Sequence, residues 1–238
     1  MLNGYYQRWA TAFHFVAFST TLLIAFACNA VTGKPSLSVL AVEYPPFTTS
    51  NVTDRGINFR LFSKAVGHRF TIKPVFVPPA RAGQVLRSSP WCVSFYPPKG
   101  MDDSVTFIPL SEQRVELAFY RAASSSERVS SLHQLANERI AVLRVKELGP
   151  FHQPLLDVGA ELLMVESIAQ GLDLLTFGRV DSILADDDGV KSALSRMQDQ
   201  PVLERSKLVY FETMVGAHLN KQCPHFEDLA ELLRNTGY

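Results

Sequence analysis

Strand and helix patterns alternate most clearly in residues 162–197, which read LLMVESIAQGLDLLTFGRVDSILADDDGVKSALSRM. Residues 162–165 and 180–185 are short apolar runs, which are typical of buried strands. Residues 167–177 and 187–197 read as helices, and the first of them is followed by a glycine of the kind that commonly ends a helix. Strands that alternate with helices in this way predict an α/β fold with mainly parallel sheets.

The alternation continues on both sides of this segment. Further strands are predicted at 37–42, 70–77, 91–96, 115–120, 140–143 and 208–219, and further helices at 58–66, 80–87, 131–136, 151–158 and 224–234. The Ser-rich stretch 122–131 is the best linker candidate, and it divides the chain into two α/β halves of about the size of a Rossmann-like lobe. Ligands of such folds bind beyond the carboxyl ends of the strands, so two lobes can enclose a ligand in a cleft.

The N-terminal residues have the pattern of an export signal. Residues 1–30 carry a single charge, Arg8, and residues 12–27 are mostly apolar but shorter than the roughly 20 residues of a membrane span. The run ends in Ala-Phe-Ala at residues 25–27, a pattern that signal peptidases accept. We therefore expect a cleaved signal peptide and a periplasmic mature chain. The alternatives are an uncleaved anchor helix and a lipid anchor at Cys28, although the lipoprotein pattern before that cysteine is imperfect.

Composition and motifs exclude several classes of protein. Of the 238 residues, 47% are hydrophobic and 19% charged, which is unlike a disordered chain. Lys and Arg together number 23, as do Asp and Glu, so no net field attracts nucleic acid. The sequence has no Gly-rich nucleotide motif and no Gly-x-Ser-x-Gly, and its six histidines and three cysteines lack metal spacing. We expect a monomer without a cofactor, metal or nucleic-acid partner.

Two segments place ligand-binding residue types at the ends of predicted strands. Residues 43–47, Glu-Tyr-Pro-Pro-Phe, follow the first strand on a stiff diproline turn, where aromatic rings can cover an organic ligand or a cation. Tyr44 and Phe47 can equally cap a lobe core. Asp186 begins a run of three acids, which could bind a cation but is better explained by the favourable dipole at the start of the next helix.

The order of these pieces resembles the periplasmic solute-binding proteins of the polar-amino-acid transporter type, family 3. The resemblance covers residues 37 to about 233. It rests on the export signal and on four segments in order, namely EYPPF at 43–47, PARAGQVL at 79–86, TFIPL at 106–110, and GRVD at 178–181 followed by Asp186.

The resemblance implies a fold with two Rossmann-like α/β lobes joined by a two-strand hinge, the type II periplasmic binding protein fold. The first lobe takes both ends of the mature chain, and the second lobe is inserted between them. Mapped onto this sequence, lobe one is 37–119 plus 212–238, and lobe two is 122–210. Such lobes close on a ligand like a hinged clamp.

The resemblance also implies ligand contacts. Tyr44 and Phe47 match the aromatic residues that line the family's cleft, and Asp186 matches the acid that pairs with the ligand's α-amine. Arg81 lies in the PARAGQVL helix, and we expect it to face one inter-lobe cleft together with these three residues. Glu43 is expected to belong to the same ligand-binding site.

Two carboxylate-binding features of the family are incomplete in this chain. Family members have an arginine after the third strand, whereas residues 97–104 read PPKGMDDS, in which Lys99 could substitute but is not an equal donor. Residues 144–147, RVKE, replace the family's Gly-Thr at a helix N-terminus. The expected ligand is a small polar organic solute, amino-acid-like or amine-bearing, and a different small solute stays open.

Three functions follow from the resemblance. The favoured one is a binding protein, not an enzyme, that captures a solute and delivers it to the membrane permease of an ABC transporter. The first alternative is an enzyme on the same scaffold, such as a dehydratase of the cyclohexadienyl type, with Glu43, Asp186 and Lys99 as the candidate acid–base groups. The second is a periplasmic sensory or regulatory binding module.

Cys92 and Cys223 are the two cysteines of the body of the chain. Cys92 lies on the third predicted strand, and the family topology returns the helix that follows Cys223 to the same lobe. In an oxidising compartment the two can form a disulfide. The alternative is a pair of buried free thiols that behave as small hydrophobic side chains.

Overall fold

The computed structural model describes residues 33–98, 101–123 and 128–235. The predicted signal peptide, Cys28 and Lys99 lie outside these residues, as does part of the Ser-rich stretch. From Lys34 onward the chain forms one compact unit. No helix within the described ranges is both long enough and apolar enough to cross a membrane.

The described strands form a single mixed sheet of eight strands in the order β2-β1-β3-β8-β4-β7-β5-β6. Their bounds are β1 Ser36–Ala41, β2 Thr71–Phe76, β3 Val93–Ser94, β4 Val105–Ala122, β5 Arg139–Leu143, β6 Glu161–Val165, β7 Ser182–Ala185 and β8 Leu203–Asn220. The helices are α1 Ile57–Val66, α2 Pro79–Ser88, α3 Gln153–Asp157, α4 Ile168–Thr176, α5 Asp187–Leu194 and α6 Phe226–Arg234, with short 3-10 turns η1 Asp102–Ser104 and η2 Leu132–Leu135. The predicted α/β class is confirmed.

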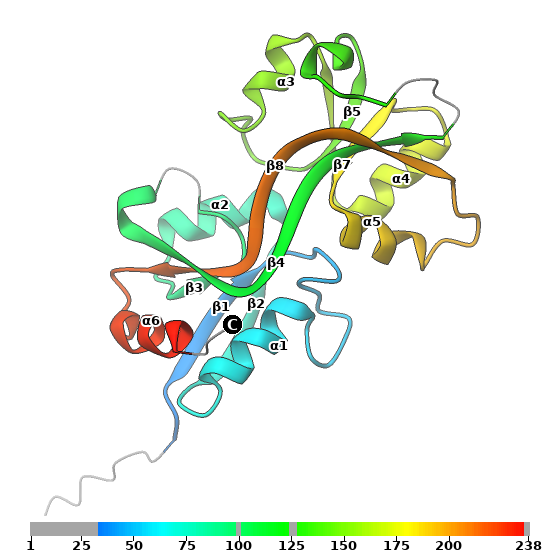
Figure 1. The fold of residues 1–238 in the computed structure, drawn as a ribbon. Helices are drawn as coiled ribbons and strands as arrows, with labels where there is room; N and C mark the ends of the chain where they lie inside the picture. Colours follow the sequence, from blue (N-terminus) through cyan, green and yellow to red (C-terminus); the bar gives the residue numbers. More distant parts are fainter. Residues whose placement is uncertain (1–32, 99–100, 124–127, 236–238) are drawn as a thin grey trace, which may run out of the picture. The chain divides into compact units, whose positions relative to one another are not determined.

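The long strands β4 and β8 connect two groups of elements (Figure 1). They pair antiparallel from Val105↔Asn220 to Ala122↔Leu203, with register shifts near the middle. At one end β8 pairs with β3, which continues into β1 and β2, and at the other end β4 pairs with β7, which continues into β5 and β6. We call the first group, with α1, α2 and α6, the first lobe, and the second group, with α3, α4 and α5, the second lobe.

The sheet differs from the mainly parallel one predicted from the sequence. The pairs within each set of three short strands are parallel, but every pair that involves β4 or β8 is antiparallel. The chain therefore passes between the lobes along β4 and β8, and β4 extends to Ala122, the first residue of the Ser-rich stretch. The sequence predicted a strand only at 115–120 because Pro109 and the polar residues 111–114 interrupt the apolar alternation of β4.

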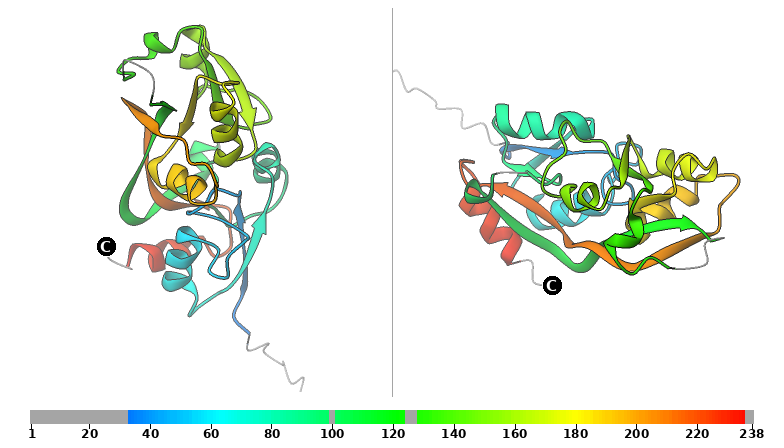
Figure 2. Two further views of the ribbon diagram at one scale, coloured as in Figure 1. Left: turned by 90° about the vertical axis from the view of Figure 1, so that its right-hand side faces the viewer. Right: turned by 90° about the horizontal axis from the view of Figure 1, so that it is seen from above.

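Each lobe buries both faces of its part of the sheet. In the first lobe, α1 and α6 cover one face with a core that includes Phe62, Leu219 and Leu229, and α2 covers the other face near Trp91. Figure 2 shows α2 on the opposite side of β1 from α6. In the second lobe, α4 and α5 pack on one face, and α3 packs on the other around Leu155. Helices on both faces of a sheet are the usual architecture of doubly wound α/β lobes.

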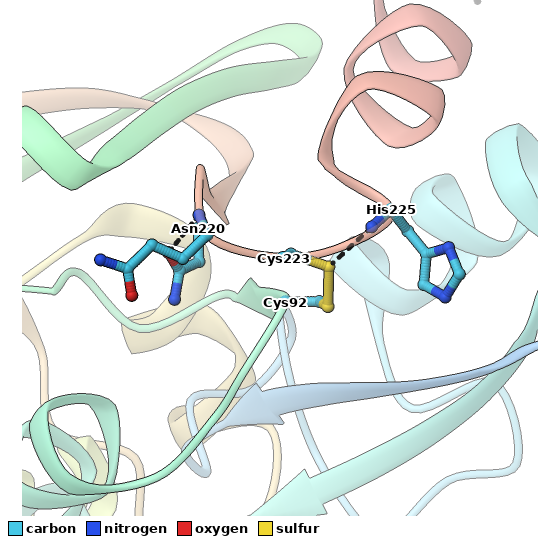
Figure 3. The surroundings of a disulfide bond; sticks show 5 residues. Cys92, Asn220, Cys223 and His225 are labelled. Carbon is cyan, nitrogen blue, oxygen red and sulfur yellow. Dashed lines mark hydrogen bonds between the residues drawn. A yellow bond between two sulfur atoms is a disulfide. The ribbon is translucent and has the colours of Figure 1, made fainter.

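Cys92 and Cys223 form a disulfide in the first lobe (Figure 3). Their Cα atoms lie 5.0 Å apart, inside the range of about 4.4–6.8 Å that a disulfide requires. The backbone N–H of Asn220 donates to the carbonyl of Cys92 at 3.0 Å, and the N–H of His225 donates to the Cys223 sulfur at 3.4 Å. The bond ties the residue that precedes β3 to the turn between β8 and α6.

Candidate ligand-binding site

A hydrogen bond joins the loop after β1 to the start of α5. The Tyr44 hydroxyl donates to Asp186 Oδ2 at 2.5 Å, and Asp186 Oδ1 accepts from the backbone N–H of Gly189 at 2.8 Å. Asp186 is thus the N-cap of α5, and it is only 2% exposed. Since Tyr44 belongs to the first lobe and Asp186 to the second, this bond connects the two lobes directly.

Burial sets the protonation states of this pair. Burial raises the pKa of the Asp186 carboxyl above its usual value, against the opposing effect of the hydrogen bonds from Tyr44 and Gly189. The pKa of Tyr44 is raised well above its usual value, first by burial and then by the Asp186 carboxylate. The tyrosine therefore keeps its proton at neutral pH and is the donor in the bond.

The two acids that follow Asp186 also have partners. The Tyr120 hydroxyl donates to Asp187 Oδ1 at 2.6 Å, and the Arg205 guanidinium lies 3.4 Å from Asp187 Oδ2. The side-chain amide of Gln113 donates to Asp188 Oδ2 at 2.7 Å. Across the described part of the chain, no group of three or more His, Cys, Asp or Glu is arranged to hold a metal ion. The acid run therefore serves the N-terminus of α5 and its contacts with β4.

A cavity of about 260 Å³ lies beside Tyr44. The first lobe lines it with the loop after β1, with α1 and with the end of β3, and the second lobe adds Leu143 of β5. The paired strands β4 and β8 form the rest of the wall, from the Phe107–His218 pair to the Leu117–Phe211 pair. Most of the lining is aromatic or aliphatic, including Tyr44, Phe47, Phe95, Phe107, Leu117 and Phe211. Among the described residues that line it, none is Asp, Glu, Lys or Arg.

Asn58 of α1 lines this cavity with a buried amide. The residue is 7% exposed, and its Nδ2 donates weakly to the carbonyl of Gly216 at 3.4 Å, while Oδ1 has no hydrogen-bond partner. The Oδ1 atom is enclosed by the protein. Gly216 itself makes room for β4, because a Cβ there would lie 2.3 Å from the Phe107 ring and 2.8 Å from the carbonyl of Ile108.

His218 contributes a neutral polar group to the same wall. Burial lowers its pKa to about 4, so the imidazole carries no charge at neutral pH. Its ring centroid lies 5.0 Å from that of Phe107 on the neighbouring strand. With Asn58 and His218 both uncharged, the cavity presents hydrogen-bonding groups in an apolar setting.

Only some of the residues predicted for the site gather at this cavity. Tyr44 and Phe47 line it. Glu43 lines a smaller cavity of about 170 Å³, to which Tyr44 also contributes, and accepts a hydrogen bond from the N–H of Ser50 at 2.7 Å. Asp186 lines a polar hollow with Asp187 and Asp188 and reaches the site through Tyr44. Arg81 is exposed on α2 and lines none of these three cavities.

Sequence reasoning missed Asn58 and His218. Asn58 stands at the start of the apolar stripe of α1, and His218 alternates with buried residues near the end of β8. A polar side chain on the buried face of a helix or strand is a signal that could have marked both, because such groups need a partner.

Comparison with known proteins supports the fold. No family model and no curated protein matches the sequence. Among solved structures, the GluR0 ligand-binding core in complex with L-glutamate superposes with a TM-score of 0.67 at 16% identity, over 84% of this chain and 91% of that chain. The arginine-bound form of truncated ArgBP from T. maritima gives a TM-score of 0.64 at 17% identity, over 84% of this chain and 93% of that one. The chain has the fold of the type II periplasmic binding proteins.

A third solved structure of this fold extends the comparison. An arginine transport-system periplasmic binding protein from Legionella pneumophila superposes with a TM-score of 0.65 at 13% identity, over 85% of this chain and 92% of that one. At these identities the likeness concerns the path of the backbone and not the ligand contacts. The predicted resemblance of the chain to the solute-binding proteins is confirmed at the level of the fold.

Proposed function

We propose that the chain binds a small organic solute in the cavity beside Tyr44. The observation that carries this proposal is the position of the cavity, which is walled by both lobes and by the strands that pass between them. Proteins of the same fold have been solved with L-glutamate or arginine bound. Ligands of α/β lobes bind beyond the carboxyl ends of their strands. Tyr44 lies in the loop after β1, and Leu143 is the last residue of β5.

The predicted division of the chain into two lobes is part of this proposal. The boundaries at 37–119 plus 212–238 and 122–210 stay a prediction, and we infer that the first lobe ends before Ala118. This inference is supported by the pairing of Ala118 and Tyr120 with β7 and by the packing of both in the core of the second lobe. We further propose that the Tyr44–Asp186 bond holds the lobes together.

Solute capture and delivery agree better with the geometry than catalysis. Of the candidate acid–base groups, neither Glu43 nor Asp186 lines the apolar cavity, and Lys99 lies outside the described residues. A dehydratase needs an acid or base within hydrogen-bond reach of its substrate. We propose a binding protein without enzyme activity that acts as a monomer in the periplasm after export and serves the permease of an ABC transporter.

Blocking the cavity tests the proposed function. The purified protein is screened by thermal shift against amino acids, amines, organic acids and neutral ring compounds, because a ligand that binds only the folded state raises the Tm. Thr213→Trp fills the cavity wall on β8 and should abolish the Tm increase. Thr71→Trp, on the exposed start of β2, is the matched control and should preserve it. Equal Tm increases in both variants would place the ligand elsewhere.

A further inference from the structure

We propose that the cavity beside Tyr44 takes an uncharged molecule of one or two rings, and not a zwitterionic amino acid. This inference rests on the proposed solute-binding function and names the class of the solute. It is carried by the charge of the cavity wall and by the size of the cavity.

The charge of the wall opposes a zwitterion. A buried carboxylate or ammonium group requires a partner of opposite charge or several hydrogen bonds. The described lining has no charged side chain, and the basic residues next to it in the sequence are already paired. Arg114 precedes the lining residue Val115 and binds Glu212, while Arg144 follows Leu143 and binds Glu166.

The acid that the family resemblance assigns to a ligand's amine is also occupied. Asp186 accepts hydrogen bonds from the Tyr44 hydroxyl and the Gly189 N–H, and it is almost fully buried. Tyr44 lies between this carboxylate and the apolar cavity, since its hydroxyl contacts Asp186 while the residue lines the cavity wall. An amine in the cavity would have to break the Tyr44–Asp186 bond to reach the acid.

Size and surface favour a small ring compound. The cavity volume of about 260 Å³ exceeds the roughly 150 Å³ that encloses a benzene molecule and falls just below the range of about 300–1,000 Å³ for drug-sized ligands. Phe211 and Met214 line the cavity but are 44% and 38% exposed. Covering these apolar side chains is favourable for an apolar ligand.

Two probes with the same ring system test this inference by isothermal titration calorimetry. Indole is neutral, and L-tryptophan adds the zwitterion to the same rings. For the unmodified protein we expect L-tryptophan to bind at least about tenfold more weakly than indole, because its charges find no partner.

The variants of the cavity wall locate the binding of indole. Thr213→Trp should abolish it, and the control Thr71→Trp should preserve it. Circular dichroism checks that both variants fold, and the comparison of the two probes on the unmodified protein stands even if Thr213→Trp does not.

The outcomes distinguish this inference from the function on which it rests. Tighter binding of L-tryptophan, L-arginine or L-glutamate than of indole would overturn the inference and leave solute binding intact. If neither indole nor any compound of the thermal-shift screen binds, the proposed function fails as well.

Discussion

The Tyr44 hydroxyl donates a hydrogen bond to the Asp186 carboxylate at 2.5 Å, although the two residues are 142 positions apart in the sequence. Tyr44→Phe removes the donor and leaves the buried carboxylate with the Gly189 N–H as its described partner. We expect the free energy of unfolding in urea to fall by about 1–3 kcal/mol. Tyr96→Phe is the control, because the described structure shows no hydrogen bond from that hydroxyl, and it should change stability by less than about 0.5 kcal/mol. Equal losses in both variants would contradict the bond.

His218 makes stability depend on pH. Its pKa falls from 6.5 in the unfolded chain to about 4 in the folded one, so the unfolded state binds the proton more readily between these values. Stability is therefore lost as the pH falls from about 6.5 to 4, by up to roughly 3 kcal/mol. In urea unfolding at several pH values, His218→Gln should lose less stability over this window than the unmodified protein. If the unmodified protein and His218→Gln lost the same stability over this pH window, the lowered pKa of His218 would be contradicted.

At the scale of elements, the close contact of β8 with β4 depends on Gly216. A Cβ there would lie 2.3 Å from the Phe107 ring and 2.8 Å from the Ile108 carbonyl, so Gly216→Ala should lower the free energy of unfolding by about 1–3 kcal/mol. Gly149→Ala is the matched control, since nothing lies within 4 Å of its added Cβ, and it should be nearly neutral. Thermal or urea unfolding measures both, and a neutral Gly216→Ala would show that β4 can move away without cost.

The elements that the sequence predicts well are those with one buried face and a clear period. The helix predicted at 58–66 and the strand predicted at 37–42 agree with α1 and β1 to within one residue at each end. Strand β4 was shortened because residues 112–114 in its middle are exposed, so apolar alternation fades there. Strand β8 was shortened at its start, where residues 204–207 are all polar. The strand predicted at 91–96 contains only the two residues of β3, since its ladder with β1 is short.

The site is predictable only where its residues stand in a loop of unusual composition. Tyr44 and Phe47 were found because aromatic residues flank a diproline turn after a strand. Asn58 and His218 belong to α1 and β8, and only the folding of β8 beside α1 brings them to one cavity. Long-range pairing of this kind leaves no local pattern in the sequence.

At the scale of the molecule, the Cys92–Cys223 disulfide closes a long loop that includes the whole second lobe. The cysteines are 131 residues apart. Because the bond restricts the conformational entropy of the unfolded chain, it nominally contributes about 4–5 kcal/mol to the free energy of unfolding. Thiol counting on the denatured, non-reduced protein should detect neither cysteine, and reduction should lower the Tm. Two reactive thiols from these positions would contradict the bond in the exported protein.

The methyl group of Met214 gives a direct NMR signal for ligand binding in the cavity beside Tyr44. The sequence has five methionines, and Met214 lines the cavity beside Tyr44, while Met164 and Met197 pack against the cores of the second lobe. With methyl-labelled methionine, and Met214→Leu to assign the signal, the ligand found by the thermal-shift screen is titrated to saturation. We expect the Met214 signal to shift most, while the Met164 and Met197 signals change little. An unchanged Met214 signal at saturation would contradict binding in this cavity.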